Sequence, residues 1–262
     1  MDKQFDGCRI DWHEDGAIFT LARPEKLNSI TLPMLDGLAH CLDELEHRAC
    51  RWLVIVGEGE RAFCAGSDLA RTPSTTREES DARVRMARSL FFRLANLPVI
   101  SVAAINGLAY GGGLEMAMAC TFRIAAPHAR LSLPEVKLGV LPAYGGTQFL
   151  PALVGSSRAL DLMLTGRPVD AAEALSMGLI NRIANADSPL IDQAIDFVGQ
   201  VTRQSQVAID GIRLCVAAAG PVVTAAGLAV EDEQVRARLG SEDAREGVRA
   251  FLEKRAPVFR HR

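Results

Sequence analysis

A glycine-rich turn between a buried strand and an apolar helix constrains this chain more than any other segment. Val99–Ile105 is apolar except for Ser101, as is typical of a buried strand. Gly111, Gly112 and Gly113 follow, and an apolar helix is expected from there through Cys120. Glycines let backbone N–H groups approach a ligand closely, and the start of a helix favours negative charge. The spacing matches neither a dinucleotide fingerprint nor a phosphate loop. A tight turn packed against a sheet is the alternative.

Two glutamates accompany glycine-rich segments. Glu115 follows the three glycines and one leucine, and its other neighbours are Met and Ala. A carboxylate in apolar surroundings is costly unless it is paired or protonated, which makes Glu115 a candidate titrating group. Glu135 follows a Leu-Pro pair and precedes a second glycine pair. Two carboxylates can divide acid and base roles when their environments separate their pKa values.

Alternation of strand-like and helical patterns predicts an α/β architecture with mostly parallel strands. The expected strands are 8–13, 17–22, 51–56, 99–105 and 122–126, and the expected helices begin at Pro33 and span 76–94. Acids alternate with arginines in REESDARVRMAR (77–88), which predicts a solvated helix face. From about residue 189 the pattern is helical. The composition shift there predicts a core over 1–190 and a helical region over 191–262.

Composition restricts the classes of partner. The formal net charge is −3 in 262 residues, and no basic–aromatic stripe is present, which argues against nucleic-acid binding. A local basic groove for an anionic cofactor remains compatible with this charge. The longest apolar region, 97–120, is interrupted by Asn106, glycines and Glu115, so no membrane span is expected. The N-terminal residues lack the apolar core of a signal peptide, and a reducing cytoplasm is the expected location.

Cysteine and histidine spacing predicts no metal site. The six cysteines form no close pair, and the five histidines lack metal-ligand spacing. We therefore expect reduced, structural cysteines. Cys64 and Ser67, in the loop AFCAGSDL (62–69), leave a nucleophile open as an alternative, although no histidine lies nearby in sequence. The other explanation of this loop is a turn followed by a helix cap at Asp68.

Six segments in order resemble the crotonase superfamily, the enoyl-CoA hydratase/isomerase family. They are ARPEKLNSIT (22–31), AFCAGSDL (62–69), INGLAYGGGLEMAMACTFRIA (105–125), LPEVKLGVLPAYGGTQFLPALVG (133–155), LTGRPVDAAEALSMGLINRI (164–183) and REGVRAFLEKR (245–255). The resemblance implies a spiral of ββα repeats and a C-terminal helical region that builds trimers, often paired into hexamers. It also implies a coenzyme A thioester as substrate, with no tightly bound cofactor and a place in fatty acid and lipid metabolism.

The resemblance also assigns site residues. It implies an oxyanion hole made by the backbone N–H groups of Ser67 and Gly112, for which Ser67 in place of a more usual alanine is acceptable. It implies coenzyme A contacts from Lys26, from the loop that includes Ala65, Asp68 and Leu69, and from Phe251 and Lys254 of another part of the trimer. The chain departs from the family pattern at Ala143, where glycine is common near the water site, and at Tyr144, which is bulkier than the usual small residue.

The presence of both glutamates resembles the hydratases, because many isomerases of the family keep only the second. The resemblance therefore implies a 2-enoyl-CoA hydratase, with Glu115 as the base for water and Glu135 as the acid at the α-carbon. An enoyl-CoA isomerase or another thioester-enolate enzyme is the first alternative. A non-catalytic relative that binds RNA or acyl-CoA is the second.

Overall fold

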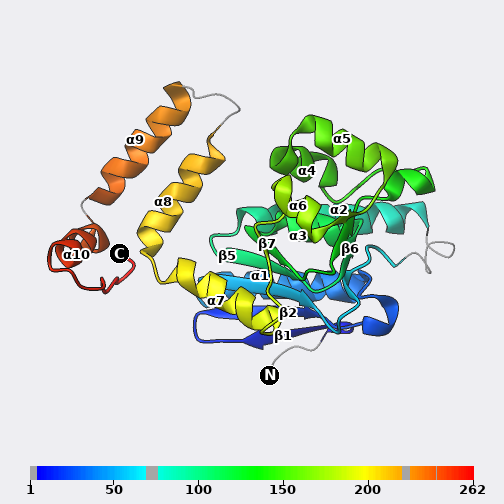
Figure 1. Cartoon of the computed structure of the whole chain (residues 1–262), viewed down its shortest axis with the longest axis horizontal. Coiled ribbons are helices and arrows are strands. Elements are labelled where there is room, and N and C mark those ends of the chain that lie inside the picture. Colours follow the sequence, from blue (N-terminus) through cyan, green and yellow to red (C-terminus); the bar gives the residue numbers. More distant parts are fainter. Residues whose placement is uncertain (1–4, 69–75, 220–224, 240) are drawn as a thin grey trace. The chain divides into compact units, whose positions relative to one another are not determined.

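The computed structural model describes residues 5–68, 76–219, 225–239 and 241–262 (Figure 1). The chain divides into two compact units, Met1–Val198 and Gly199–Arg262, and each is described by itself. Leu69 lies outside the described residues. Within the described part of the chain, no helix combines the length and apolar character needed to span a membrane.

A six-stranded sheet organises the first unit. Its order is β1 (Cys8–Trp12), β2 (Gly16–Leu21), β3 (Trp52–Gly57), β5 (Ile100–Ile105), β7 (Phe122–Ala125) and β10 (Arg182–Ile183). Only the β1–β2 pair is antiparallel, and the other pairs are parallel. Every residue of β5 is buried, as its largely apolar sequence predicts for a parallel strand covered on both faces. The predicted mostly parallel α/β architecture is confirmed.

A second, four-stranded sheet carries the loops of the candidate site. It contains β4 (Ala62–Cys64), β6 (Leu108–Tyr110), β8 (Arg130–Ser132) and β9 (Val169–Asp170), and only the β8–β9 pair is antiparallel. These strands have two or three residues each. Such short strands show no periodicity, and the sequence did not predict them.

Helices of the first unit pack around these sheets (Figure 1). They are α1 (Leu32–His47), α2 (Arg77–Asn96), α3 (Gly112–Ala119), α4 (Gly146–Val154), α5 (Ser156–Thr165) and α6 (Ala171–Ser176), with 3₁₀ helices η1 (Pro24–Lys26) and η3 (Glu135–Leu138). Helix α1 buries Leu35, Leu38, Leu42 and Leu45, the leucines whose helical spacing predicted it. Thr76 begins α2 with a capping box in which Glu79 is the reciprocal partner.

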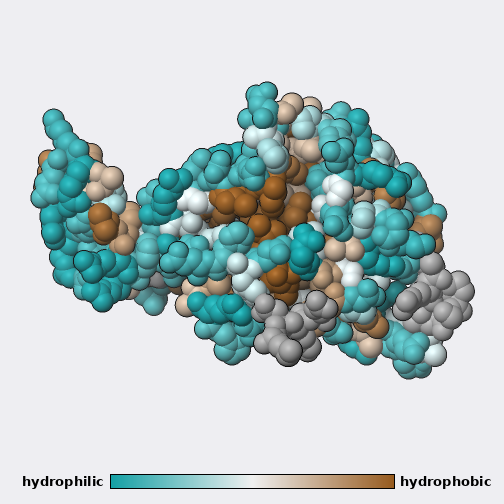
Figure 2. Space-filling view, turned by 90° about the horizontal axis from the view of Figure 1, so that it is seen from below, coloured by the Kyte–Doolittle hydropathy of each residue, from teal (hydrophilic) through white to brown (hydrophobic). Residues whose placement is uncertain are grey.

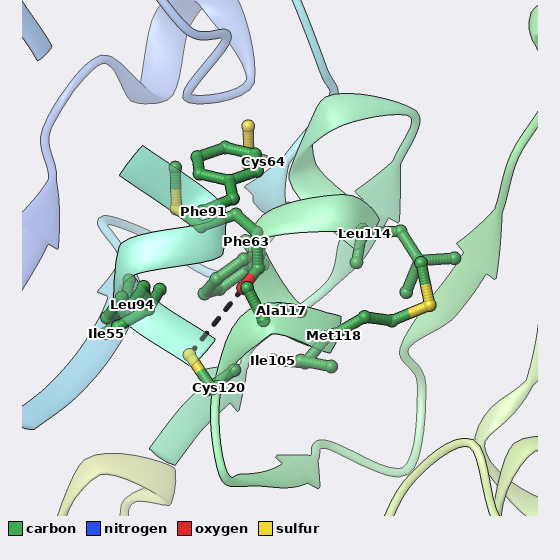
Figure 3. Packing of buried hydrophobic residues seen from close by; sticks show 14 of the residues in the cluster. Ile55, Phe63, Cys64, Phe91, Leu94, Ile105, Leu114, Ala117, Met118 and Cys120 are labelled. Carbon is green, nitrogen blue, oxygen red and sulfur yellow. Dashed lines mark hydrogen bonds between the residues drawn. The ribbon is translucent and has the colours of Figure 1, made fainter. Parts of the chain in front are cut away.

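Helix α3 is buried along its whole length. Figure 3 shows Leu114, Ala117 and Met118 of this helix among side chains from other elements, including Phe63 of β4 and Phe91 of α2. Both phenylalanines are fully buried. Protein interiors pack at the density of organic crystals, so a helix enclosed in this way has little room to shift. The backbone that carries Glu115 is therefore held rigidly.

The second unit is helical, as the sequence predicts beyond residue 189. Helix α7 (Leu190–Thr202) crosses the division between the units, and α8 (Gln206–Ala217), α9 (Ala225–Leu239) and α10 (Glu242–Leu252) follow. The Asp243 carboxylate, 2% exposed, accepts hydrogen bonds from the N–H groups of Arg260 and His261, which ties the last residues to α10. Figure 2 shows one face of the molecule coloured by hydropathy, on which the largest hydrophobic area is bordered by hydrophilic residues and smaller hydrophobic areas lie elsewhere.

Candidate active site

A cavity of about 350 Å³ in the first unit is lined by both glutamates and by the glycine turn that the sequence predicted to form the site. The loop after β4, the start of α3, the 3₁₀ helix η3 and the segment before α4 line it. Glu115, Glu135, Ser67, Gly112 and Ala65 all belong to its wall. Segments up to about 80 positions apart in the sequence therefore meet at one cavity, as the two glycine-rich segments predicted.

The glycine turn before α3 leaves one backbone donor free. Gly111 has φ +52°, in the left-handed region that favours glycine. A Cβ at Gly113 would overlap the carbonyl oxygen of Cys64, so only glycine fits there. Gly111 donates its N–H to Ser132, whereas the N–H of Gly112, the first residue of α3, has no acceptor among the described residues. The helix start directs its positive dipole end toward this position.

A second free donor comes from the loop after β4. The N–H of Ile30 donates to the carbonyl of Gly66 (2.8 Å), and the N–H of Asp68 donates to the carbonyl of Ile30 (3.2 Å). These bonds flank Ser67, whose own N–H has no acceptor among the described residues. A Cβ placed on Gly66 would lie 3.4 Å from the nitrogen of Gly112, so the two segments are in contact. An oxyanion hole requires two such N–H donors, close together and without a hydrogen-bond acceptor within the protein.

Glu115 is a buried carboxylate held by backbone donors. Its side chain is 1% exposed, and its Oε1 accepts hydrogen bonds from the N–H groups of Tyr144 (2.8 Å) and Gly146 (2.7 Å). Burial raises the pKa of Glu115 to about 7, the negative charge of Glu135 adds to the rise, and the backbone hydrogen bonds oppose it. Near neutral pH, both the protonated and the ionised forms of Glu115 are therefore populated.

Glu135 occupies a different environment on the same cavity. It begins η3, burial raises its pKa, and its Oε2 is buried without a hydrogen-bond partner among the described residues. A Cβ on Gly111 would lie 3.0 Å from its Oε1, which places the carboxyl against the glycine turn. One glutamate is thus fixed by two backbone donors and the other has a free oxygen. Unequal environments of this kind allow two carboxyl groups to take different roles.

Two hydroxyl groups pair at the cavity wall. Ser67 Oγ lies 2.6 Å from the hydroxyl of Tyr144, and the Tyr144 ring meets Phe91 edge-to-face with centroids 5.8 Å apart. This pair was not predicted from the sequence, because only the N–H of Ser67 was expected to take part in the site and Tyr144 was a departure from the family pattern. The nucleophile alternative loses support, because Ser67 has a tyrosine rather than a histidine beside it. Burial also raises the pKa of the Cys64 thiol to about 12, which disfavours its thiolate.

The residues expected to contact coenzyme A are distributed over both units. Lys26 is exposed on η1, Ala65 lines the cavity, and the Asp68 carboxylate pairs with Arg23 at 3.1 Å. Phe251 is 82% exposed at the end of α10, and Lys254 is exposed just beyond it in the second unit. Exposure leaves these two side chains available to a neighbouring subunit, and that role stays a prediction.

Comparisons with known proteins identify the family. A family model described as enoyl-CoA hydratase/isomerase matches residues 14–262. The chain belongs to this family. An enoyl-CoA hydratase structure from Bacillus anthracis superimposes with a TM-score of 0.92 at 33% identity, covering 98% of this chain and 100% of that one. The structure of DspI from Pseudomonas aeruginosa gives a TM-score of 0.90 at 35% identity, with 99% and 98% covered.

A curated relative extends the comparison. The mitochondrial methylglutaconyl-CoA hydratase of Mus musculus is 35% identical over 237 residues, which cover 89% of this chain and 76% of that protein. Together with the structural matches, this likeness confirms the predicted crotonase-type α/β fold with C-terminal helices. The family resemblance drawn from six short segments therefore holds over nearly the whole chain.

The buried state of Glu115 predicts a pH-dependent gain in stability for Glu115→Gln. The pKa of Glu115 is about 7 in the fold against an ordinary 4.5, so the folded state binds the proton more tightly than the unfolded chain. Stability then falls as pH rises from about 4.5 through 7, by about 3 kcal/mol in total. Glutamine keeps the acceptor oxygen without the charge. Denaturant unfolding should show a larger stabilisation by this variant at pH 8 than at pH 5.

The exposed Glu60→Gln variant is the control, because it removes a carboxylate that is in contact with water. Its effect on the free energy of unfolding should be small at both pH values. A Glu115→Gln effect of equal size at pH 5 and pH 8 would contradict the raised pKa.

Proposed function

We propose that this protein hydrates 2-enoyl-CoA thioesters. The observation that carries the proposal is one cavity that holds a buried glutamate, Glu115, and a half-buried one, Glu135, beside two backbone N–H groups without a hydrogen-bond acceptor among the described residues. Hydration needs a group that takes a proton from water and a group that delivers one to carbon. It also needs donors for the thioester oxygen, on which negative charge develops. Relatives named as hydratases support the same activity.

In the proposed reaction, the thioester oxygen accepts hydrogen bonds from the N–H groups of Ser67 and Gly112. Glu115 in its ionised form takes a proton from water as the water oxygen bonds to Cβ. The π electrons of the double bond move toward Cα and the thioester carbonyl, giving an enolate that the two donors and the helix end stabilise. Glu135 in its protonated form then delivers a proton to Cα, and the thioester is restored as a 3-hydroxyacyl-CoA.

Burial raises the pKa of both glutamates, and their hydrogen-bond partners distinguish the two environments. Backbone donors at Oε1 favour ionised Glu115 against the effect of burial, and its pKa of about 7 is near that of an efficient general base. Glu135 lacks donors on Oε2, and its raised pKa favours retention of a proton. The substrate supplies the coenzyme A moiety, for which we propose Lys26, Ala65 and Asp68 as contacts. No tightly bound cofactor is part of the scheme.

The main alternative is isomerisation of a 3-enoyl-CoA to a 2-enoyl-CoA. One base suffices to move a proton between two carbons, so isomerisation needs only Glu135. Purified protein should be given 2-enoyl-CoA and 3-enoyl-CoA thioesters separately, and the products identified by mass spectrometry and chromatography. Formation of 3-hydroxyacyl-CoA from the 2-enoyl thioester supports hydration. Conversion of the 3-enoyl thioester to the 2-enoyl isomer without hydration would favour the alternative.

Assembly into trimers, alone or paired as hexamers, is a second part of the proposal. Large apolar side chains are exposed on the second unit, among them Ile212, Leu214, Val216, Val235, Val248 and Phe251. Exposed apolar area of this kind marks interaction surfaces. We propose that assembly brings Phe251 and Lys254 to a neighbour's coenzyme A site, and analytical ultracentrifugation of the full chain measures the assembly directly. The six cysteines are free, in keeping with our proposal of a reducing cytoplasm as the location.

A further inference from the structure

The cavity wall contains one positively charged side chain that has no anionic partner among the described residues. Arg83 of α2 is the single basic side chain among the described residues that line the cavity. Among the described residues, its buried Nε has no hydrogen-bond partner and no carboxylate forms an ion pair with it. The segment 69–75, LARTPST, contains no acidic side chain that could supply one. Arg85 and Arg88 are exposed, as a solvated face predicts, whereas Arg83 is half-buried and lines the cavity.

Arg83 lies on the Tyr144 side of the cavity. Burial raises the pKa of the Tyr144 hydroxyl, and the hydrogen bond with Ser67 and the positive charge of Arg83 partly offset this rise. The pKa of Glu115 instead responds to burial, to backbone donors and to Glu135. The hydroxyl of Tyr144 is already paired with Ser67 Oγ. Ser80, one helical turn before Arg83, lines the same wall and adds a second polar side chain.

A buried guanidinium N–H without an acceptor is unfavourable, because its interaction with water is lost and nothing replaces it. The guanidinium group is planar and matches the two oxygens of a carboxylate in a paired arrangement. An unpaired arginine that faces a substrate cavity therefore indicates that the anion arrives with the substrate.

The proposed reaction decides which part of the substrate reaches Arg83. The thioester carbonyl lies at Ser67 and Gly112, the reacting carbons lie at the two glutamates, and the acyl chain continues from there along the cavity. We propose that the acyl chain ends in a carboxylate that binds Arg83, so that the substrates are short 2-enoyl-CoA thioesters of dicarboxylic acids. This inference rests on the proposed function for the placement of the acyl chain. A coenzyme A phosphate is the other anion available, but phosphates are strongly hydrated, whereas Nε of Arg83 is buried.

The test is the binding of matched saturated thioesters, which requires no turnover. Isothermal titration calorimetry should show that the wild-type protein binds pentanedioyl-CoA about 10- to 100-fold more tightly than pentanoyl-CoA. Arg83→Met should abolish this preference and leave pentanoyl-CoA binding within about threefold of wild type, since only the distal carboxylate loses its partner. Arg83→Lys should retain part of the preference through its charge. Arg85→Met removes an equal charge from an exposed position of the same helix and should keep the preference.

The binding measurements also distinguish a carboxylate site at Arg83 from a phosphate contact. Equal weakening of both thioesters by Arg83→Met would point to a phosphate contact and overturn the proposal, as would a wild-type preference for pentanoyl-CoA or binding of neither thioester. Arg83→Gln is the second variant if Arg83→Met does not fold, which thermal unfolding reports. Hydration of 2-pentenedioyl-CoA and of 2-pentenoyl-CoA by the wild-type protein tests the proposed function separately. The absence of hydration of both, together with a carboxylate preference in binding, would reject the activity and keep the Arg83 site.

Discussion

Glu115→Gln and Glu135→Gln should each lower the rate of 2-enoyl-CoA hydration by about 10²–10⁴-fold, the usual contribution of one general acid or base. Glutamine preserves the shape of each side chain and cannot exchange the proton that the reaction requires. Binding of a saturated thioester should stay close to wild type, because the N–H groups of Ser67 and Gly112 remain in place. Steady-state kinetics with a short 2-enoyl-CoA and calorimetry with its saturated analogue provide the two measurements.

The double variant, with both Glu115→Gln and Glu135→Gln, shows whether the two glutamates act together in one mechanism or independently. Residues that act as a unit give losses well short of additive, so the double variant should be little slower than the slower single variant. Near-normal hydration by both single variants would reject the two-carboxylate mechanism. An isomerase would behave differently, because Glu115→Gln would keep proton transfer by Glu135 and convert a 3-enoyl-CoA at close to the wild-type rate.

Features carried by one continuous segment were predictable from the sequence. The apolar runs of β3 and β5 indicated buried parallel strands, and the leucine spacing of α1 indicated an amphipathic helix. The apolar neighbours of Glu115 predicted its burial, which the structure confirms at 1% exposure. In each of these cases, the residues whose pattern predicts the element or the burial are close neighbours in the sequence.

Features that depend on distant segments were not predictable. The donors to Glu115 come from Tyr144 and Gly146, and the hydroxyl pair joins residues 77 positions apart. The alternating charges around Arg83 predicted solvent exposure, because periodicity on a helix does not reveal which turn faces a cavity. The position of that turn depends on how α2 packs against the rest of the core, as with Phe91 in Figure 3. Propensity and pattern therefore locate the elements, whereas tertiary packing decides the electrostatics of the site.

The second large effect is expected at the oxyanion donor of α3. Gly112→Pro removes the N–H that we propose as a donor to the thioester oxygen, and loss of one such donor costs about 10²–10³-fold in kcat. Proline is tolerated at the first position of a helix, where the N–H has no partner within the helix. Residue 112 holds that position in α3. The helix should therefore form, and circular dichroism with thermal unfolding checks that it does.

Gly112→Ala is the matched control, because it adds a Cβ and keeps the N–H. That Cβ would lie 2.8 Å from the ring of Tyr144 and 3.2 Å from Ile30, so some loss of rate is expected from crowding alone. The rate difference between the proline and alanine variants then isolates the contribution of the N–H. If the two folded variants turn over 2-enoyl-CoA at the same reduced rate, crowding explains the whole effect. The thioester oxygen then has a different stabilising partner, because removal of the Gly112 donor changed nothing further.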